Sequence, residues 1–118
     1  MENVFVCYPR CSTCQRAKAY LEARGVAFTV RPIHEQNPSA EELRAWQSRS
    51  GLPLRRFFNT SGQKYRDLNL KERLPGMDEE AQLALLATDG MLVKRPILLL
   101  GDRVLIGFRE DEWEEALG

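Results

Sequence analysis

The sequence predicts an α/β fold, a mixed sheet of about four strands flanked by helices, with an all-helical insertion in the middle of the chain. Three observations lead to this fold class: a strand–helix–strand pattern at the start, helical patterns across residues 38–92, and a hairpin with a helix at the end. A chain of 118 residues has the size of one domain. We therefore expect a single domain over residues 1–118, with the insertion at approximately residues 38–92.

The opening unit is a strand, a helix and a second strand. Residues 4–7 form a short β-prone run, and residues 12–24 are good helix formers whose apolar positions recur at helical spacing until Gly25. Residues 26–33 then alternate apolar and polar positions, which is typical of a strand. A right-handed crossover between the two strands predicts that they are parallel.

The middle of the chain carries start signals of helices. Ser39 and Glu42 have the spacing of a capping box, and the helix that they begin is expected to end at Gly51. Residues 54–68 hold apolar pairs around a turn and suggest two short helical pieces. Asp78 is expected to cap the last helix of the insertion.

The end of the chain predicts an antiparallel hairpin and a closing helix. The strands are expected at residues 97–100 and 104–106, with residues 101–103 as the turn, and the helix over residues 110–117. With the opening unit, this gives the outline of a thioredoxin-like fold with a helical insertion.

Composition restricts the compartment and the partners. The 17 basic residues balance the 17 acidic ones, so we expect no direct binding of nucleic acid. Apolar runs such as residues 97–100 are too short to span a membrane, and the N-terminus lacks the pattern of a secretory signal. We therefore expect a cytoplasmic protein, in which closely spaced cysteines favour redox chemistry or metal binding over structural disulfides.

The stretch "CYPRCSTCQRAK" at residues 7–18 contains all three cysteines. Cys11 falls at the N-terminal edge of the predicted helix, where unpaired N–H groups and the helix dipole lower the pKa of a thiol. Cys14 lies three residues further on the same helix face, so it can resolve a disulfide formed on Cys11. We predict Cys11 as the nucleophile and Cys14 as the resolving thiol, and we expect Arg10, Ser12 and Thr13 beside them to contact the substrate.

Two other interpretations of the cysteines stay open at this point. A zinc site would need Cys7, Cys11, Cys14 and His34, but the sequence contains no second CxxC pair and no HxxxH element, so we expect no metal. The CxxC pair would alternatively be structural and inert. Cys7 itself is expected to be a buried core residue and His34 a surface loop residue.

Arg95 and Pro96 precede the first strand of the predicted hairpin. A proline that opens a buried strand cannot donate to the sheet, and X–Pro is the common place for a cis peptide bond. In thioredoxin-like folds a cis-proline at this point faces the thiol helix and presents backbone groups to the substrate, so Pro96 is the candidate. Arg95 would then direct its guanidinium at an anion or thiolate beside Cys11, whereas the alternative is a solvated basic pair with Lys94.

Four segments together resemble the arsenate reductase (ArsC)/Spx family over essentially the full length: "YPRCSTCQRAKAYLEARGVAF", "FFNTSGQKYRDLNLKERLP", "LLATDGMLVKRPILL" and "VLIGFREDEWEEAL". The resemblance implies that Cys11 takes the place of the reactive cysteine and that Arg95 and Pro96 take the places of the family's arginine and cis-proline. It further implies a thiol reductant as partner (glutathione, glutaredoxin or thioredoxin), with no cofactor other than glutathione as a co-substrate.

The sequence departs from the arsenate reductase branch at three positions. Cys14 stands where glutathione-coupled reductases have serine, and Asn59 and Phe108 stand where two further oxyanion-binding arginines are expected. Three other arginines are near these positions but shifted: Arg55, Arg56 and Arg109. Loss of two of three charged donors is expected to weaken oxyanion binding by several kcal/mol, at about 1.5–3 kcal/mol each.

Three functions therefore follow from the resemblance. The first is a thiol-disulfide redox protein of an ArsC-like branch with a CxxC motif. The second is a redox-switched regulator similar to Spx, which contacts the C-terminal domain of the RNA polymerase α-subunit. The third is an arsenate reductase coupled to glutaredoxin or thioredoxin.

Overall fold

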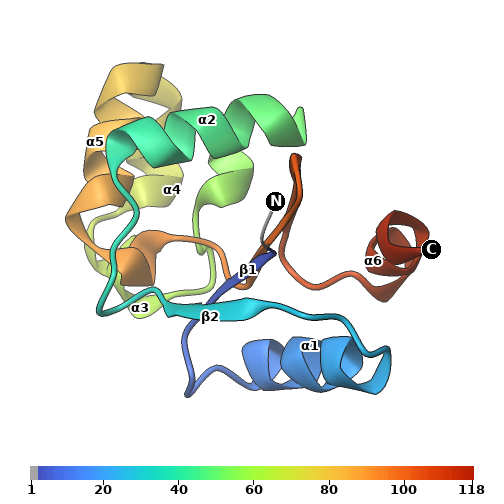
Figure 1. Cartoon of the computed structure of the whole chain (residues 1–118). Helices are drawn as coiled ribbons and strands as arrows, with labels where there is room; N and C mark the ends of the chain where they lie inside the picture. Colours follow the sequence, from blue (N-terminus) through green and yellow to red (C-terminus); the bar gives the residue numbers. More distant parts are fainter. Residues whose placement is uncertain (1–2) are drawn as a thin grey trace.

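A computed structural model describes residues 3–118 and contains a four-stranded sheet between two layers of helices (Figure 1). The strands are β1 (Val4–Cys7), β2 (Thr29–Pro32), β3 (Ile97–Leu100) and β4 (Arg103–Ile106), in the order β2-β1-β3-β4. Strand β1 is parallel to β2 and antiparallel to β3, and β3 is antiparallel to β4. The predicted mixed, thioredoxin-like sheet and its parallel opening pair are confirmed.

One face of the sheet is covered by α1 (Ser12–Ala23) and α6 (Glu110–Leu117), at the predicted positions. The buried side of α1 consists of Cys14, Ala17 and Leu21, which share a core cluster with Trp113 of α6. The indole Nε1 of Trp113 donates a hydrogen bond of 3.0 Å to the carbonyl of Gly107. Helix α6 is thereby fixed to the loop that follows β4.

The other face is covered by the helical segment between β2 and β3 (Figure 1). Its elements are α2 (Ala40–Ser50), the 3-10 turn η1 (Leu54–Phe57), α3 (Gln63–Asp67), α4 (Leu70–Arg73), the 3-10 turn η2 (Leu74–Gly76), α5 (Glu79–Thr88) and the 3-10 turn η3 (Gly90–Leu92). The predicted capping box of α2 and the Asp78 cap of α5 are both present. Helix α4 and the turns η2 and η3 were not predicted, because each spans only three or four residues and shows no periodicity.

The alternation along the strands divides the core between the two faces. Phe5 and Cys7 of β1 point toward α1, whereas Val6 packs with the helical segment. Strand β2 is shorter than predicted, since residues 26–28 lie outside it. It is an edge strand, which leaves Val30 40% exposed. Arg103, predicted in the turn, instead pairs with Leu100 at the start of β4.

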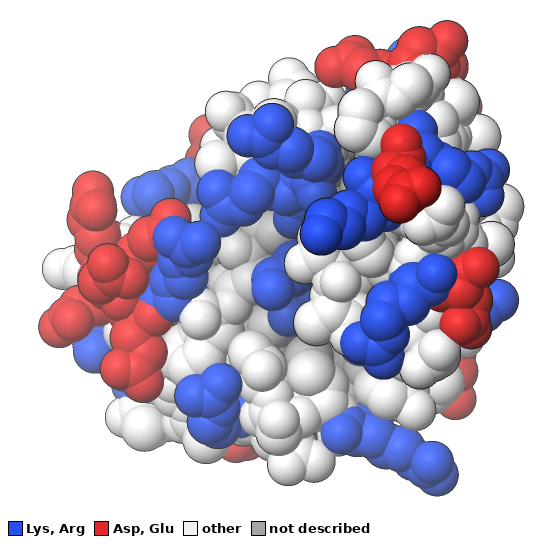
Figure 2. Space-filling view, turned by 180° about the vertical axis from the view of Figure 1, so that it is seen from behind, with Lys and Arg blue, Asp and Glu red and all other residues white. Residues whose placement is uncertain are grey.

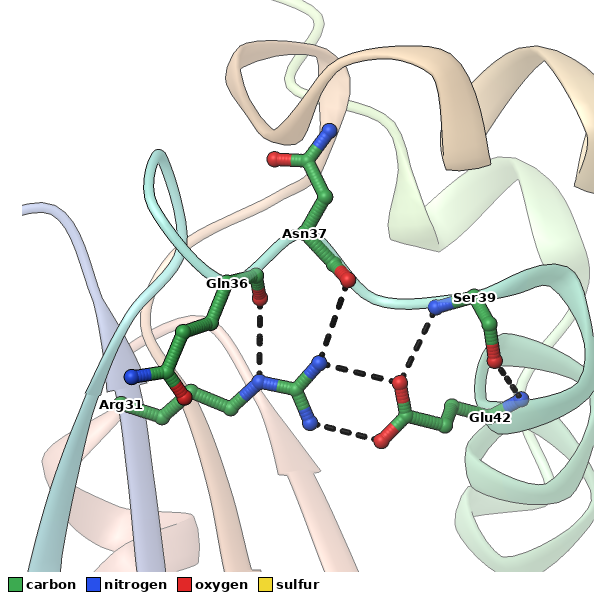
Figure 3. Close-up of polar contacts among 5 residues, drawn as sticks. All are labelled: Arg31, Gln36, Asn37, Ser39 and Glu42. Atoms are coloured by element: carbon green, nitrogen blue, oxygen red, sulfur yellow. Dashed lines mark hydrogen bonds and ion pairs between the residues drawn. The ribbon is translucent and has the colours of Figure 1, made fainter.

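Strand β2 and helix α2 are joined by a polar cluster around Arg31 (Figure 3). The guanidinium donates to both carboxylate oxygens of Glu42, at 2.6 and 2.9 Å, and to the carbonyls of Gln36 and Asn37, at 3.0 and 3.2 Å. Glu42 also accepts from the backbone N–H of Ser39 at 3.0 Å. The connection from the sheet to the helical segment is therefore fixed by charge-assisted hydrogen bonds.

Over residues 3–118, the structure contains no helix with the length and apolar character that crossing a bilayer requires.

Candidate thiol active site

Cys11 occupies the N-cap position of α1. Its backbone is extended, with φ −83° and ψ 122°, and its N–H donates to the carbonyl of Tyr8 at 2.9 Å. Its own carbonyl accepts from the N–H of Gln15 at 3.0 Å, the first hydrogen bond of the helix. The Cys11 side chain, partly exposed, thus lies where the first-turn N–H groups have no partner within the helix.

The surroundings of Cys11 favour its thiolate. Burial raises the pKa of the Cys11 thiol, but the backbone N–H of Cys14, the Cys14 thiol, the backbone N–H of Thr13 and the charge of Arg95 together outweigh it, and the net pKa is lowered. These N–H groups lie at the positive end of the helix dipole, which also favours a thiolate. Cys11 therefore has the environment of a nucleophilic cysteine.

Cys14 is buried, with 2% of its surface exposed. Burial raises the pKa of Cys14 to about 12, with the adjacent Cys11 adding to the effect, although the backbone N–H of Tyr8 opposes it. Each thiol shifts the pKa of the other, and neither is in a disulfide. One thiol is thus disposed to ionise and its neighbour to stay protonated.

Arg95 lies half-buried beside Cys11. Its guanidinium is 5.3 Å from the ring centre of Tyr8, and Nη1 donates to Sδ of Met91 at 3.4 Å. Its Nε is buried and has no hydrogen-bond partner among the described residues. Arg95 is thus a partly buried cation that lines the same cavity as Cys11, and its charge favours the Cys11 thiolate, whereas Lys94 is exposed.

The Arg95–Pro96 peptide bond is cis, as predicted. Pro96 is buried, and its carbonyl accepts from the N–H of Gly107 at 2.8 Å. This hydrogen bond joins the backbone at the cis bond to the loop that follows β4.

A cavity of about 580 Å³ opens at Cys11. Five cationic residues line it: Arg16, Arg56, Lys94, Arg95 and Arg109. Within residues 3–118, no Asp or Glu lines it. Figure 2 shows this hollow with Lys and Arg gathered around it and the acidic side chains toward the margins of the face. In a chain of zero net charge, the Cys11 thiol thus lies at a cavity lined by cations and by no carboxylate of the described residues.

The predicted substrate contacts are only partly brought together. Thr13 lines the cavity, whereas Arg10 and Ser12 are exposed, and neither they nor Pro96 belong to its lining. Asn59 and Phe108, at the positions where arginines were expected, do line it.

Sequence reasoning missed the convergence of cations on this cavity. The shifted Arg56 and Arg109 both reach it, but Arg55 lines a different cavity, beside Tyr65 and Lys71. No spacing in the sequence relates these side chains to Cys11. Arg16, five residues after Cys11 on α1, is the one cation of the lining whose position near Cys11 the sequence indicates.

The described residues contain no cluster that supports the alternative of a zinc site. Among residues 3–118, no group of three or more His, Cys, Asp or Glu side chains converges as a metal site would require. Cys7 is buried, as predicted, and His34 is exposed, with its ring against Tyr8 at 5.1 Å between ring centres.

The fold and the helix-terminal thiol pair define a thioredoxin-like protein with a CxxC site. The chain belongs to the ArsC family, whose family pattern matches residues 7–116. It is 54% identical to the uncharacterized protein YusI of Bacillus subtilis, over 98% of both chains.

Two regulators are more distant relatives. The regulatory protein MgsR of Bacillus subtilis is 30% identical, over 92% of this chain and 84% of its own length. The global transcriptional regulator Spx of Staphylococcus haemolyticus is 28% identical, over 88% of this chain and 78% of its own.

Solved structures share the fold closely. An ArsC-family-related protein from Bacteroides fragilis superimposes with a TM-score of 0.94 at 51% identity, over 98% of this chain and 97% of that one. A possible arsenate reductase from Streptococcus mutans gives a TM-score of 0.86 at 42% identity, over 95% and 97% of the two chains. The predicted family membership is confirmed.

Proposed function

We propose that the chain is a thiol-disulfide redox protein, in which Cys11 is the attacking thiolate and Cys14 the resolving thiol. The observation that carries this proposal is the position of Cys11 at the N-terminus of α1, with its thiol pKa lowered in part by the neighbouring Cys14 thiol. A thiolate beside a second thiol is the minimum arrangement for disulfide exchange.

The reaction proceeds in two exchanges. The Cys11 thiolate attacks a substrate disulfide, forms a mixed disulfide and expels one substrate thiolate. Cys14 then loses its proton and attacks the Cys11 sulfur, which releases the second substrate thiolate and leaves a Cys11–Cys14 disulfide. The protein is oxidised by two electrons and the substrate is reduced by two, and a thiol reductant returns the protein to its dithiol form.

The environment of Cys14 suits the second exchange. In the reduced protein burial raises the pKa of Cys14, and the charge of the Cys11 thiolate raises it further. The mixed disulfide on Cys11 removes that charge, so the pKa of Cys14 falls at the step in which Cys14 acts as the nucleophile.

The cavity indicates the kind of substrate and reductant. Its cationic lining favours anions. Arg95 is the lining cation whose charge lowers the pKa of Cys11, and Thr13 also lines the cavity. Glutathione fits this preference as co-substrate, since it is an anionic thiol, and glutaredoxin or thioredoxin are the alternative reductants. We place the activity in the cytoplasm, where these thiol systems operate.

The Cys14→Ser variant tests the assignment of the two thiols. Reduced wild-type protein treated with hydroxyethyl disulfide should lose its two thiol hydrogens and retain no adduct in an intact-mass measurement. Cys14→Ser should instead accumulate a stable mixed disulfide on Cys11, because nothing resolves it. Cys11→Ser, the matched control, should remain largely unmodified over the same time. A Cys14→Ser variant that clears its adduct as fast as wild type would contradict the resolving role.

A redox-switched regulator is the second candidate, and the similarity to MgsR and Spx favours it. In this function the Cys11–Cys14 disulfide would control binding to the C-terminal domain of the RNA polymerase α-subunit. A pull-down with that isolated domain, run with the dithiol and disulfide forms, separates the candidates. Binding that depends on the redox state supports the regulator, whereas no binding in either form contradicts it.

Arsenate reduction is the third candidate, favoured by the likeness to the Streptococcus mutans structure. Arg56 and Arg109 line the cavity from shifted positions, so cationic donors are present although Asn59 and Phe108 replace the expected arginines. Arsenate-dependent turnover with glutathione and glutaredoxin, or with thioredoxin, would support this candidate. Absence of turnover with both systems would contradict it.

A further inference from the structure

Cys7 is the one cysteine that the proposed exchange does not use. It ends β1 with its side chain directed toward α1, in the same core cluster as Cys14 and Ala17. The backbone N–H of Tyr8, the residue that follows Cys7, and Cys7 itself both influence the pKa of Cys14. The two side chains thus both lie in the contact between the sheet and α1.

A second, smaller cavity of about 140 Å³ touches both of these cysteines. It is separate from the cationic cavity at Cys11, and its lining is mainly apolar: Phe5, Cys7, Pro9, Cys14, Gln15, Lys18 and Val30. Both thiols therefore border the same free space. Lys18 supplies the positive charge at this cavity and favours the thiolate of Cys7.

We propose that Cys7 is a second resolving thiol, which attacks the Cys14 sulfur of the Cys11–Cys14 disulfide from the side of this small cavity. The Cys7–Cys14 bond forms as the Cys11–Cys14 bond breaks. Cys7 gives its proton to solvent and Cys11 leaves as a thiolate, so the number of disulfides is unchanged and no further oxidant is needed. This inference rests on the proposed function, which supplies the first disulfide.

The direction of the exchange follows from the leaving groups. A thiol of lower pKa leaves faster, and Cys11 has its pKa lowered while that of Cys14 is raised. Attack on Cys14 therefore expels the better-stabilised sulfur. Burial raises the pKa of Cys7, which makes this exchange slower than the first and faster as the pH rises. The product is an oxidised protein whose nucleophile, Cys11, is free again at the mouth of the cationic cavity.

The sequence provides a direct assay. Trypsin cuts after Arg10 and after Arg16, so Cys7 falls in peptide 1–10 and the other two cysteines in peptide 11–16. A Cys11–Cys14 disulfide stays within one peptide, whereas a Cys7–Cys14 disulfide joins the two. The full-length protein is oxidised with hydroxyethyl disulfide. Samples taken over time are acid-quenched, blocked with N-ethylmaleimide and digested with trypsin, and the masses of the peptides are measured without reduction.

The expected result is an internal disulfide in peptide 11–16 at early times, followed by a joined pair of peptides in which Cys11 carries N-ethylmaleimide. The joined pair should be lost in Cys7→Ala, which keeps a small apolar side chain in the core, and in Cys14→Ser. Cys7→Ala should still form the internal disulfide, which shows that the variant folds.

Three results would overturn the inference. If the internal disulfide persists with N-ethylmaleimide only on Cys7, the second exchange does not occur, although the proposed function stands. If a joined pair survives in Cys14→Ser, Cys7 bonds Cys11 instead. If no disulfide forms at all, the proposed function fails together with the inference.

Discussion

The ionisation of the Cys11 thiol depends on a balance among a few neighbouring groups. Burial opposes ionisation, and the N–H groups of the first helical turn, the Cys14 thiol and Arg95 favour it. Arg95 is effective because, within the described residues, no carboxylate pairs with it and its Nε has no partner. The charge of Arg95 is therefore not neutralised by a carboxylate, and it can favour the Cys11 thiolate.

Replacing Arg95 tests this balance at a single residue. Arg95→Met keeps an unbranched side chain over Tyr8 and removes the charge, so the pKa of Cys11 should rise. Alkylation of Cys11 by iodoacetamide at pH 7 should slow several-fold, because less thiolate is present. The matched control is Arg10→Met, adjacent to Cys11 in sequence but exposed and outside the cavity lining.

Equal slowing in Arg95→Met and Arg10→Met would contradict the role of Arg95, since it would indicate a general effect of net charge.

Among the elements, α1 and the joint between β2 and α2 determine the site. Helix α1 buries Cys14, Ala17 and Leu21 against the sheet, and this fixes where its N-terminus presents Cys11. The Arg31–Glu42 cluster anchors the helical segment, which delivers Arg56 and Asn59 to the cavity. The hydrogen bond from Arg31, and to a lesser extent the N–H of Ser39, lowers the pKa of Glu42 despite its partial burial.

The Glu42→Gln variant tests this joint through its pH dependence. A carboxylate whose pKa is lowered on folding stabilises the protein above its unfolded pKa, about 4.3, and the stabilisation is lost as the pH falls through the folded pKa. We expect Glu42→Gln to reduce the free energy of unfolding by about 1–2 kcal/mol at pH 7, measured by urea denaturation. The difference from wild type should shrink toward pH 3.

Glu41→Gln is the control, because Glu41 lies in the same first turn and is exposed. A Glu42→Gln loss of stability that is constant between pH 7 and pH 3 would show that the Arg31 pairing is not its cause.

At the scale of the whole molecule, local patterns predicted the elements and long-range packing decided the site. The helix that begins after Cys11, the Ser39–Glu42 capping box and the Arg95–Pro96 cis bond each depend on residues close in sequence, so they were predictable. The edge position of β2 was not predictable from the sequence, because it depends on which strands pair. The exposure of Val30 follows from that position and was therefore not predictable either.

The cationic cavity shows the same limit. Its charges come from α1, η1, the segment before β3 and the loop after β4, and only the folded chain brings these together. Arg10 and Ser12 adjoin Cys11 in sequence and yet are exposed and do not line the cavity. The charge balance of the whole sequence is zero and gives no indication of this clustering.

The ionisation of Cys11 is the claim on which the account depends, and its pH titration tests it most directly. The rate of iodoacetamide modification at Cys11, located by mass spectrometry, is measured against pH in the folded protein and in the same protein unfolded in urea. We predict a lower midpoint for the folded protein than for the unfolded chain, because the helix terminus, Cys14 and Arg95 favour the thiolate. A folded midpoint equal to or above the unfolded one would contradict the account.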